Sequence, residues 1–253
     1  MSWAERYGLW RSWLMYYGKP FNRRRLKGFY SGFIGKGDLV FDIGAHLGNR
    51  SEAWLALGAR VIAAEPQPIC VQYLQKRFLS NEHFYLLKAV VGAEAGTTIF
   101  NISARSPTIS TARQLDWQYS INQYSWKPST WDKQLQVQVV TLDMMIQDYG
   151  MPSFCKIDTE GFEWEVIQGL NHAIETISLE YLAFDLERII RCLKKLNTLG
   201  SYHCNFSPGE SQRWMYSQWV PVNEFTNILE HSPFPHRFGD IYLTMNKNII
   251  ESS

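Results

Sequence analysis

An acidic residue followed by two glycines four positions apart stands out near the start of the chain, in Asp42-Ile-Gly44-Ala-His-Leu-Gly48-Asn49. A dinucleotide site places its glycines closer together, as GxGxxG, around a pyrophosphate at a helix N-terminus. The wider spacing suits a zwitterionic aminoacyl group without phosphate, whose ammonium Asp42 would meet while the glycines let the backbone approach. S-adenosylmethionine matches this description. The residues expected to contact it in this turn are Asp42, Gly44, Ala45, His46, Gly48 and Asn49.

A second acidic residue stands where a ribose contact is expected. Glu65 follows Asp42 by about 20 residues and ends the next predicted strand, where its carboxylate can accept both ribose hydroxyls. Each feature alone is a weak signal, but together, in strand-turn-helix-strand order, they indicate the cofactor. Pro66 follows Glu65 directly and belongs to the same predicted site. The small apolar residues Ala89 and Val90, at the end of the third predicted strand, are expected to bracket adenine.

Two further carboxylates, Asp158 and Glu160, follow the strand predicted at 153–158. Ligands bind beyond the carboxyl ends of strands in open α/β sheets, which places both beside the methyl group of the cofactor. Because this donor is already activated, the enzyme has mainly to align an acceptor and remove its proton. We therefore predict Asp158 as the base and Glu160 as a second catalytic group. Enzymes that methylate base amines commonly carry an Asn/Asp-Pro-Pro-aromatic turn here, whereas this chain has Asp-Thr-Glu-Gly, so oxygen is the expected acceptor atom.

Other roles for polar residues near this turn are less favoured. Glu163, in the first turn of the following helix, is expected to act structurally at the positive end of the helix dipole. His46 is an alternative base, although a position between glycines more often indicates cofactor contact or exposure. A divalent metal bound by Asp158, Glu160, Asp185 and Glu187 is a further alternative, and we predict no metal site. Asp185 and Glu187 are expected to form a polar lip of the pocket.

Apolar β-prone runs alternate with segments of helical period, as in a mostly parallel sheet covered by helices on both faces. The predicted strands are 39–44, 60–65, 84–91, 97–103, 137–142, 153–158, 181–187 and 240–245. The first helix is expected to begin at Asn49 as its N-cap. Residues 104–136 show little sustained period and contain several aromatic residues, so we predict an acceptor-binding lid there. The aromatic residues of this segment are Trp117, Tyr119, Tyr124, Trp126 and Trp131.

Four segments resemble the motifs of the FkbM family of methyltransferases: Phe41-Asp-Ile-Gly-Ala-His-Leu-Gly-Asn49, Ala63-Ala-Glu-Pro66, Val140-Thr-Leu-Asp143 and Lys156-Ile-Asp-Thr-Glu-Gly-Phe-Glu163. The resemblance runs from residue 38 to Leu243. It implies a class I methyltransferase fold, a Rossmann-like three-layer sandwich with a mostly parallel seven-stranded sheet and an antiparallel last strand. It also implies S-adenosylmethionine as donor and, often, a hydroxyl of a sugar, glycan or natural product as acceptor.

Charge divides the chain into a basic leader at 1–37 and a catalytic domain at 38–253. The leader holds eight Lys and Arg and only Glu5, a balance of +7, which leaves −6 for the remainder. A basic leader rich in Trp and Tyr suits peripheral contact with anionic lipid or a polyanion. We favour instead a helix whose aromatic residues at 3, 7, 10 and 13–14 pack over the catalytic domain. Every proposed cofactor residue lies at or after Asp42, so we expect cofactor affinity not to depend on the leader.

Composition narrows the remaining alternatives. The chain has no apolar run of membrane-spanning length and no signal-peptide pattern, and its four cysteines form no CxxC pair, so we expect a cytoplasmic protein with free thiols. The negative balance of the catalytic domain makes a nucleic-acid acceptor unfavourable. Asp42, Gly44, Glu65 and Asp158 are all intact, which argues against a non-catalytic relative of the fold. The sequence does not predict the oligomeric state.

Overall fold

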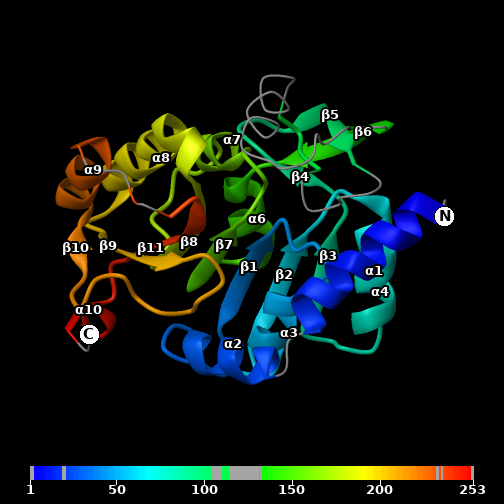
Figure 1. Cartoon of the computed structure of the whole chain (residues 1–253), viewed down its shortest axis with the longest axis horizontal. Coiled ribbons are helices and arrows are strands. Elements are labelled where there is room, and N and C mark those ends of the chain that lie inside the picture. Colours follow the sequence, from blue (N-terminus) through cyan, green and yellow to red (C-terminus); the bar gives the residue numbers. More distant parts are fainter. Residues whose placement is uncertain are drawn as a thin grey trace.

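The computed structural model describes residues 3–18, 21–103, 110–113, 131, 133–231, 234 and 236–251. Its centre is an eight-stranded sheet in the order β10-β9-β11-β8-β7-β1-β2-β3 (Figure 1). The strands are β1 Leu39–Ile43, β2 Arg60–Ala64, β3 Phe84–Leu87, β7 Phe154–Ile157, β8 Thr176–Leu182, β9 His203–Pro208, β10 Val220–Pro221 and β11 Phe238–Thr244. Pairing is parallel from β8 to β3, whereas β11 runs antiparallel to β8 and β9. The predicted Rossmann-like sheet with an antiparallel last strand is confirmed, with the short β10 extending it to eight strands.

Helices cover both faces of this sheet, and β1 shows how the sequence separates the two cores. Val40 packs into a cluster with α2 (Asn22–Tyr30), α3 (Asn49–Leu55) and α4 (Pro68–Phe78). Phe41 and Ile43 point the other way, into a cluster with α6 (Leu142–Tyr149), α7 (Glu163–Gln168), α8 (Leu186–Leu199) and α9 (Val222–His231). Alternation along a buried strand thus produces the three layers. All four cysteines are free and buried, as expected.

A second, three-stranded sheet interrupts the strand that the sequence predicts at 84–91. The chain leaves the main sheet after Leu87, and β4 (Val90–Val91) instead pairs parallel with β6 (Lys133–Val140). β5 (Gly96–Ile102) pairs antiparallel with the other edge of β6. This sheet carries its own small apolar cluster, in which Val90 is buried away from the main sheet.

The strand predicted at 181–187 is wrong in its position. β8 begins at Thr176 and ends at Leu182, and a short 3-10 turn, η2 (Ala183–Asp185), leads into α8. Asp185 consequently precedes α8 and pairs with Arg113 at 2.6 Å. Glu187 is exposed in the first turn of α8, where it pairs with Arg191. The proposed polar lip formed by these two carboxylates on one strand is therefore not present.

The leader forms two helices, one packed into the core and one at the periphery of the molecule. α2 buries Leu26 and Tyr30 in the core beside β1. α1 (Trp3–Tyr17) lies next to α4 at the periphery of the molecule (Figure 1). The prediction that its aromatic residues face the core is wrong for Trp3, Trp10 and Trp13, whose exposed fractions are 82%, 57% and 44%. Among the described helices, none combines the length and apolar character needed to cross a membrane.

Candidate active site

A pocket of about 800 Å³, counted with its opening to solvent, lies at the carboxyl ends of the central strands. The strand order reverses between β1 and β7, because β2 and β3 continue from one side and β8 from the other. Open α/β sheets bind their ligands at such a reversal. Residues that line it include Asp42, Ala45, His46, Asn49, Glu65, Pro66, Ala89, Val90, Asp158 and Glu160. The structure therefore brings nearly all predicted site residues together.

The two glycines of the predicted cofactor turn have different roles. Gly44 lines the pocket at φ 82°, and a Cβ built on it would lie 1.9 Å from the backbone oxygen of Asp158. Its missing side chain thus allows the turns after β1 and β7 to touch. Gly48 does not contribute to the pocket lining. A Cβ built on it would collide with the side chains of Leu74 and Phe78 in α4, so this glycine allows close packing of the turn against α4. Gly48 also occupies the N-cap position of α3, so the expectation that Asn49 caps this helix is wrong.

Glu65 anchors the backbone at one end of the pocket. One carboxylate oxygen accepts the N–H of His46 and the other accepts that of Gln67, both at 2.8 Å. Burial raises the pKa of Glu65 to about 7, although both hydrogen bonds oppose this shift. Each oxygen bonded in this way still has capacity for a further donor. Near Glu65, Val90 and Phe100 provide apolar wall, so this end offers a bidentate acceptor beside an apolar surface.

His46 sits in the left-handed region at φ 50°, which is unusual for a residue other than glycine. Burial lowers its pKa to about 4, so the imidazole is neutral near pH 7. Neither ring nitrogen has a hydrogen-bond partner among the described residues. The ring edge meets Tyr16 of α1 with centroids 5.4 Å apart. Both ring nitrogens are free to meet a ligand in the pocket, which is compatible with the contact role predicted for His46.

Asp158 follows β7 and is held by two cations. Lys156 Nζ lies 3.2 Å from its carboxylate and Arg50 lies 3.8 Å from it. Burial alone would raise the pKa of Asp158, but Lys156 and Arg50 outweigh it and keep the pKa below its ordinary value. Lys156 also bonds Asp240 of β11 at 2.8 Å, which fixes the ammonium from its other side. Asp158 is therefore ionised at neutral pH.

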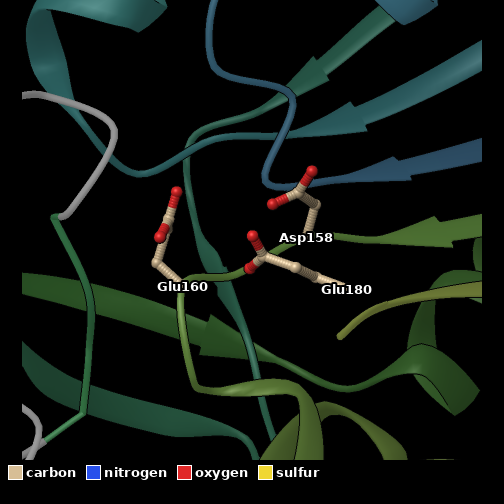
Figure 2. A group of neighbouring side chains, drawn as sticks. All are labelled: Asp158, Glu160 and Glu180. Carbon is tan, nitrogen blue, oxygen red and sulfur yellow. The ribbon is translucent and has the colours of Figure 1, made fainter. Parts of the chain in front are cut away.

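Two glutamates share the space in front of Asp158. Carboxylate oxygens of Asp158, Glu160 and Glu180 lie within 4.8 Å of one another, and Figure 2 shows the three groups turned toward a common space. Burial and the charge of Asp158 raise the pKa of Glu160 well above its ordinary value. Burial and the charge of Glu160 do the same for Glu180. Burial and neighbouring carboxylates thus favour the protonated forms of Glu160 and Glu180 beside the ionised Asp158, and the protons belong to the cluster rather than to single residues.

Glu163 holds the turn that presents these groups. Its Oε1 accepts the backbone N–H of Thr159 at 2.8 Å and the Thr159 hydroxyl at 2.9 Å. Glu160, inside this turn, adopts φ 54°, a strained conformation that costs on the order of 1 kcal/mol or more. Strain of this kind persists only where the surroundings enforce it, and Glu163 supplies the enforcing contacts. Its role is structural, as the sequence predicts, but it acts on the loop as well as on the helix end.

The residues of the site that escape sequence reasoning include Tyr16, Arg50, Glu180 and Asp240, and also Phe100 and Ala112 of the apolar wall. Glu180 carried a detectable signal, because it is the one acid of β8, which lies beside the strand that leads to Asp158. Tyr16 comes from the leader that we expected to stand apart from the site. Of the predicted lid, Trp117, Tyr119, Tyr124 and Trp126 lie outside the described residues.

Comparisons with known proteins agree with this geometry. The model of the methyltransferase FkbM domain matches residues 42–206, more than half of the chain. A TehB-like SAM-dependent methyltransferase from Corynebacterium glutamicum is similar in structure, with TM-score 0.50 and 10% identity over 96% of this chain and 98% of that one. Precorrin-6y C5,15-methyltransferase from Geobacter metallireducens has TM-score 0.47 and 12% identity over 90% and 89% of the two chains. No curated protein matches the chain significantly.

The FkbM match covers both turns of the pocket, from Asp42 in the first to Asp158 and Glu160 in the second. The similarity to the Corynebacterium structure shows the fold alone at its low identity. The family match and the pocket lie in the same part of the chain. The chain therefore belongs to the FkbM methyltransferase family and is an S-adenosylmethionine-dependent methyltransferase.

Proposed function

We propose that the protein methylates a hydroxyl oxygen of a sugar, glycan or natural product. The observation that carries the proposal is an ionised Asp158, held by Lys156 and Arg50, directly behind the turn that contains Gly44. This places an available proton acceptor next to the proposed cofactor turn. Carboxylate bases contribute about 10²–10⁴ in rate when they meet the reacting proton at hydrogen-bond distance.

The donor set of the pocket fits S-adenosylmethionine. Glu65 offers two carboxylate oxygens for a ribose, and the apolar side chains of Val90, Phe100 and Ala112 line the wall for an adenine. Asp42, which accepts the Ser51 hydroxyl, and the carboxylates around Asp158 suit the cationic part of the molecule. When bound, this cofactor supplies a methyl group on a sulfonium that is already activated for in-line attack.

The carboxylate cluster favours oxygen over nitrogen as the acceptor atom. Asp158, Glu160 and Glu180 surround the place where an acceptor would enter. Negative charge and carboxylic acids there would keep an amine protonated, so that its lone pair is blocked. A hydroxyl is neutral and becomes nucleophilic as its proton leaves.

Each residue of the cluster has a separate task in this mechanism. Asp158 would accept the proton of the acceptor hydroxyl when that oxygen takes up the methyl group and the carbon–sulfonium bond of the donor breaks. Glu160, whose raised pKa favours its protonated form, would donate a hydrogen bond that orients the acceptor. Lys156 remains paired with Asp240 when the charge on Asp158 is neutralised, so no buried cation loses its last partner.

A matched pair of acceptors tests the proposal. Purified protein with S-adenosylmethionine carrying a labelled methyl group is offered a panel of neutral glycosides, each beside its analogue with one hydroxyl replaced by an amine. We expect label on oxygen in at least one neutral glycoside, and little transfer to the amine analogue near pH 7. Preferential methylation of the amine at that pH would contradict the proposal. Calorimetry with the cofactor establishes separately that the protein used is competent to bind it.

A further inference from the structure

The outward face of α1 carries an apolar stripe that nothing in the described chain covers. Trp3, Tyr7, Trp10 and Leu14 recur at intervals of four and three residues, which places them on one side of a helix. Their exposed fractions are 82%, 46%, 57% and 48%. The rings of Trp3, Tyr7 and Trp10 follow one another at centroid distances of 6.1 and 6.2 Å. We call these four residues the outer stripe of α1.

The opposite side of α1 is attached to the catalytic domain. Leu9, Tyr16 and Tyr17 pack against a small cluster that contains Leu47 and Ile69. Tyr17 donates a hydrogen bond from its hydroxyl to the backbone oxygen of Leu47 at 3.0 Å. These contacts fix the orientation of α1 on the catalytic domain, and this orientation keeps the outer stripe exposed to solvent.

Basic residues surround the outer stripe. Arg6 and Arg11 are exposed and, by helical spacing, flank it on its two sides. The first 37 residues together carry a balance of +7. A surface of rings with polar tips, bordered by arginines, matches the boundary between anionic lipid headgroups and acyl chains.

We infer that the outer stripe of α1 binds the surface of an anionic lipid bilayer, with the helix lying in the plane of the interface. Charge decides between this occupant and a second copy of the chain. Packing two stripes together would bring Arg6 and Arg11 of both copies to the same seam, and like charges repel. An anionic bilayer neutralises the same charges and accepts the Trp and Tyr rings. Since α1 also places Tyr16 in the pocket wall, docking would set the pocket close to the membrane.

Vesicle sedimentation of the full-length protein tests this inference. The probes are vesicles of phosphatidylcholine alone and vesicles with about 30 mol% phosphatidylserine. We expect binding to the anionic vesicles only, weakened as salt concentration rises. The variant Trp3→Ala/Trp10→Ala should lower the partition coefficient at least about tenfold, because both lost rings insert at the interface. Arg6→Glu/Arg11→Glu should lower it by a similar factor through charge alone.

A matched control removes apolar side chains elsewhere on the surface. Leu79 and Met151 are exposed by 85% and 46% and lie outside the leader, so Leu79→Ala/Met151→Ala should bind vesicles as the wild type does. Circular dichroism and melting temperature verify that each variant folds. The inference fails if the wild type does not bind anionic vesicles, or if the stripe and control variants bind equally. A third outcome would also contradict it: the wild type forms a dimer, this dimer does not bind vesicles, and the substitutions Trp3→Ala/Trp10→Ala dissociate it.

Discussion

Lys156 Nζ lies 3.2 Å from the carboxylate of Asp158, and the lysine side chain is fully buried. The two residues are two positions apart in the chain. A strand repeats its side-chain direction every two residues, so both groups point to the same face of the sheet. The end of β7 thus carries the cation that keeps the carboxylate directly after the strand ionised. Asp240 holds this cation from the neighbouring region of the sheet.

Replacing Asp158 by Asn should slow methyl transfer at least about a hundredfold while S-adenosylmethionine still binds, since the amide keeps the shape but cannot act as base. Single-turnover rates and calorimetry measure the two quantities. Glu160→Gln should lose less, because an amide can still donate a hydrogen bond to the acceptor. If neither substitution slows transfer by even about tenfold in folded protein, the base lies elsewhere.

Glu65→Ala should weaken S-adenosylmethionine binding by about 1.5–3 kcal/mol, the range for hydrogen bonds to a charged group. The pKa of Glu65 is about 7, so its ionised form gains population as pH rises through neutrality. Cofactor affinity of the wild type should therefore increase between about pH 6 and 8, and Glu65→Gln should lose most of this increase. Calorimetry at several pH values checks both expectations. A flat profile for the wild type would mean that the ribose contact does not depend on the carboxylate.

Asp42→Asn should make unfolding less sensitive to pH. Burial raises the pKa of Asp42 from 3.8 to about 6, so the stability that the protonated form contributes is present below 3.8 and is lost as pH rises through 6. The asparagine variant cannot ionise. Its unfolding free energy relative to wild type should rise by up to about 3 kcal/mol between about pH 4 and 7. Urea unfolding without cofactor measures this, and a constant difference across the range would contradict the burial argument.

Lys156→Met should destabilise the protein by about 3 kcal/mol, because it leaves Asp158 and Asp240 with only the longer contacts to Arg50. The double variant Lys156→Met/Asp240→Asn removes one of these charges and should recover part of the loss. Urea unfolding of the wild type, both single variants and the double variant gives the coupling energy. An additive result would mean that Lys156 and Asp240 do not act as a pair.

Chelator should leave the activity of the purified enzyme unchanged. Lys156 and Arg50 already place positive charge beside Asp158, and the raised pKa values of Glu160 and Glu180 favour their protonated forms. A metal ion would have to displace these protons, which weakens its binding. If chelator abolishes transfer and magnesium restores it, the three carboxylates are better interpreted as a cation site, and Asp158 as one of its ligands.

The sequence predicted which residues meet in the pocket wherever residue type and local position coincide. Asp42 lies near the end of a strand of high apolar content, Glu65 and Asp158 directly follow such strands, and the carboxyl ends of parallel strands meet at one edge. Lys156 was visible within the same motif, but its role was not, because burial and its contact with Asp240 depend on β11, which is more than eighty residues away. Contacts over such separations are determined by strand order rather than by local pattern.

Boundary errors explain the residues that were missed. Moving the predicted strand 181–187 to its observed position, Thr176–Leu182, is what places Glu180 in the cluster and removes Asp185 and Glu187 from it. The outward orientation of Trp3 and Trp10 was missed for another reason. Helical spacing shows that residues share a face, but it does not show which face meets the protein.

The contact between Gly44 and the backbone of Asp158 makes catalytic activity a reporter of strand pairing. The turn after β1, which contains Gly44, and the turn after β7, which begins at Asp158, approach so closely that the two strands have little freedom to slip relative to each other. A shift by one residue would also reverse the faces of the strand that moved and send its polar residue, Asp42 of β1 or Lys156 of β7, into the opposite helical layer. A partly folded chain with the wrong pairing would therefore be inactive, whatever its helix content. Recovery of methyl transfer during refolding should accordingly not precede the formation of this pair of strands.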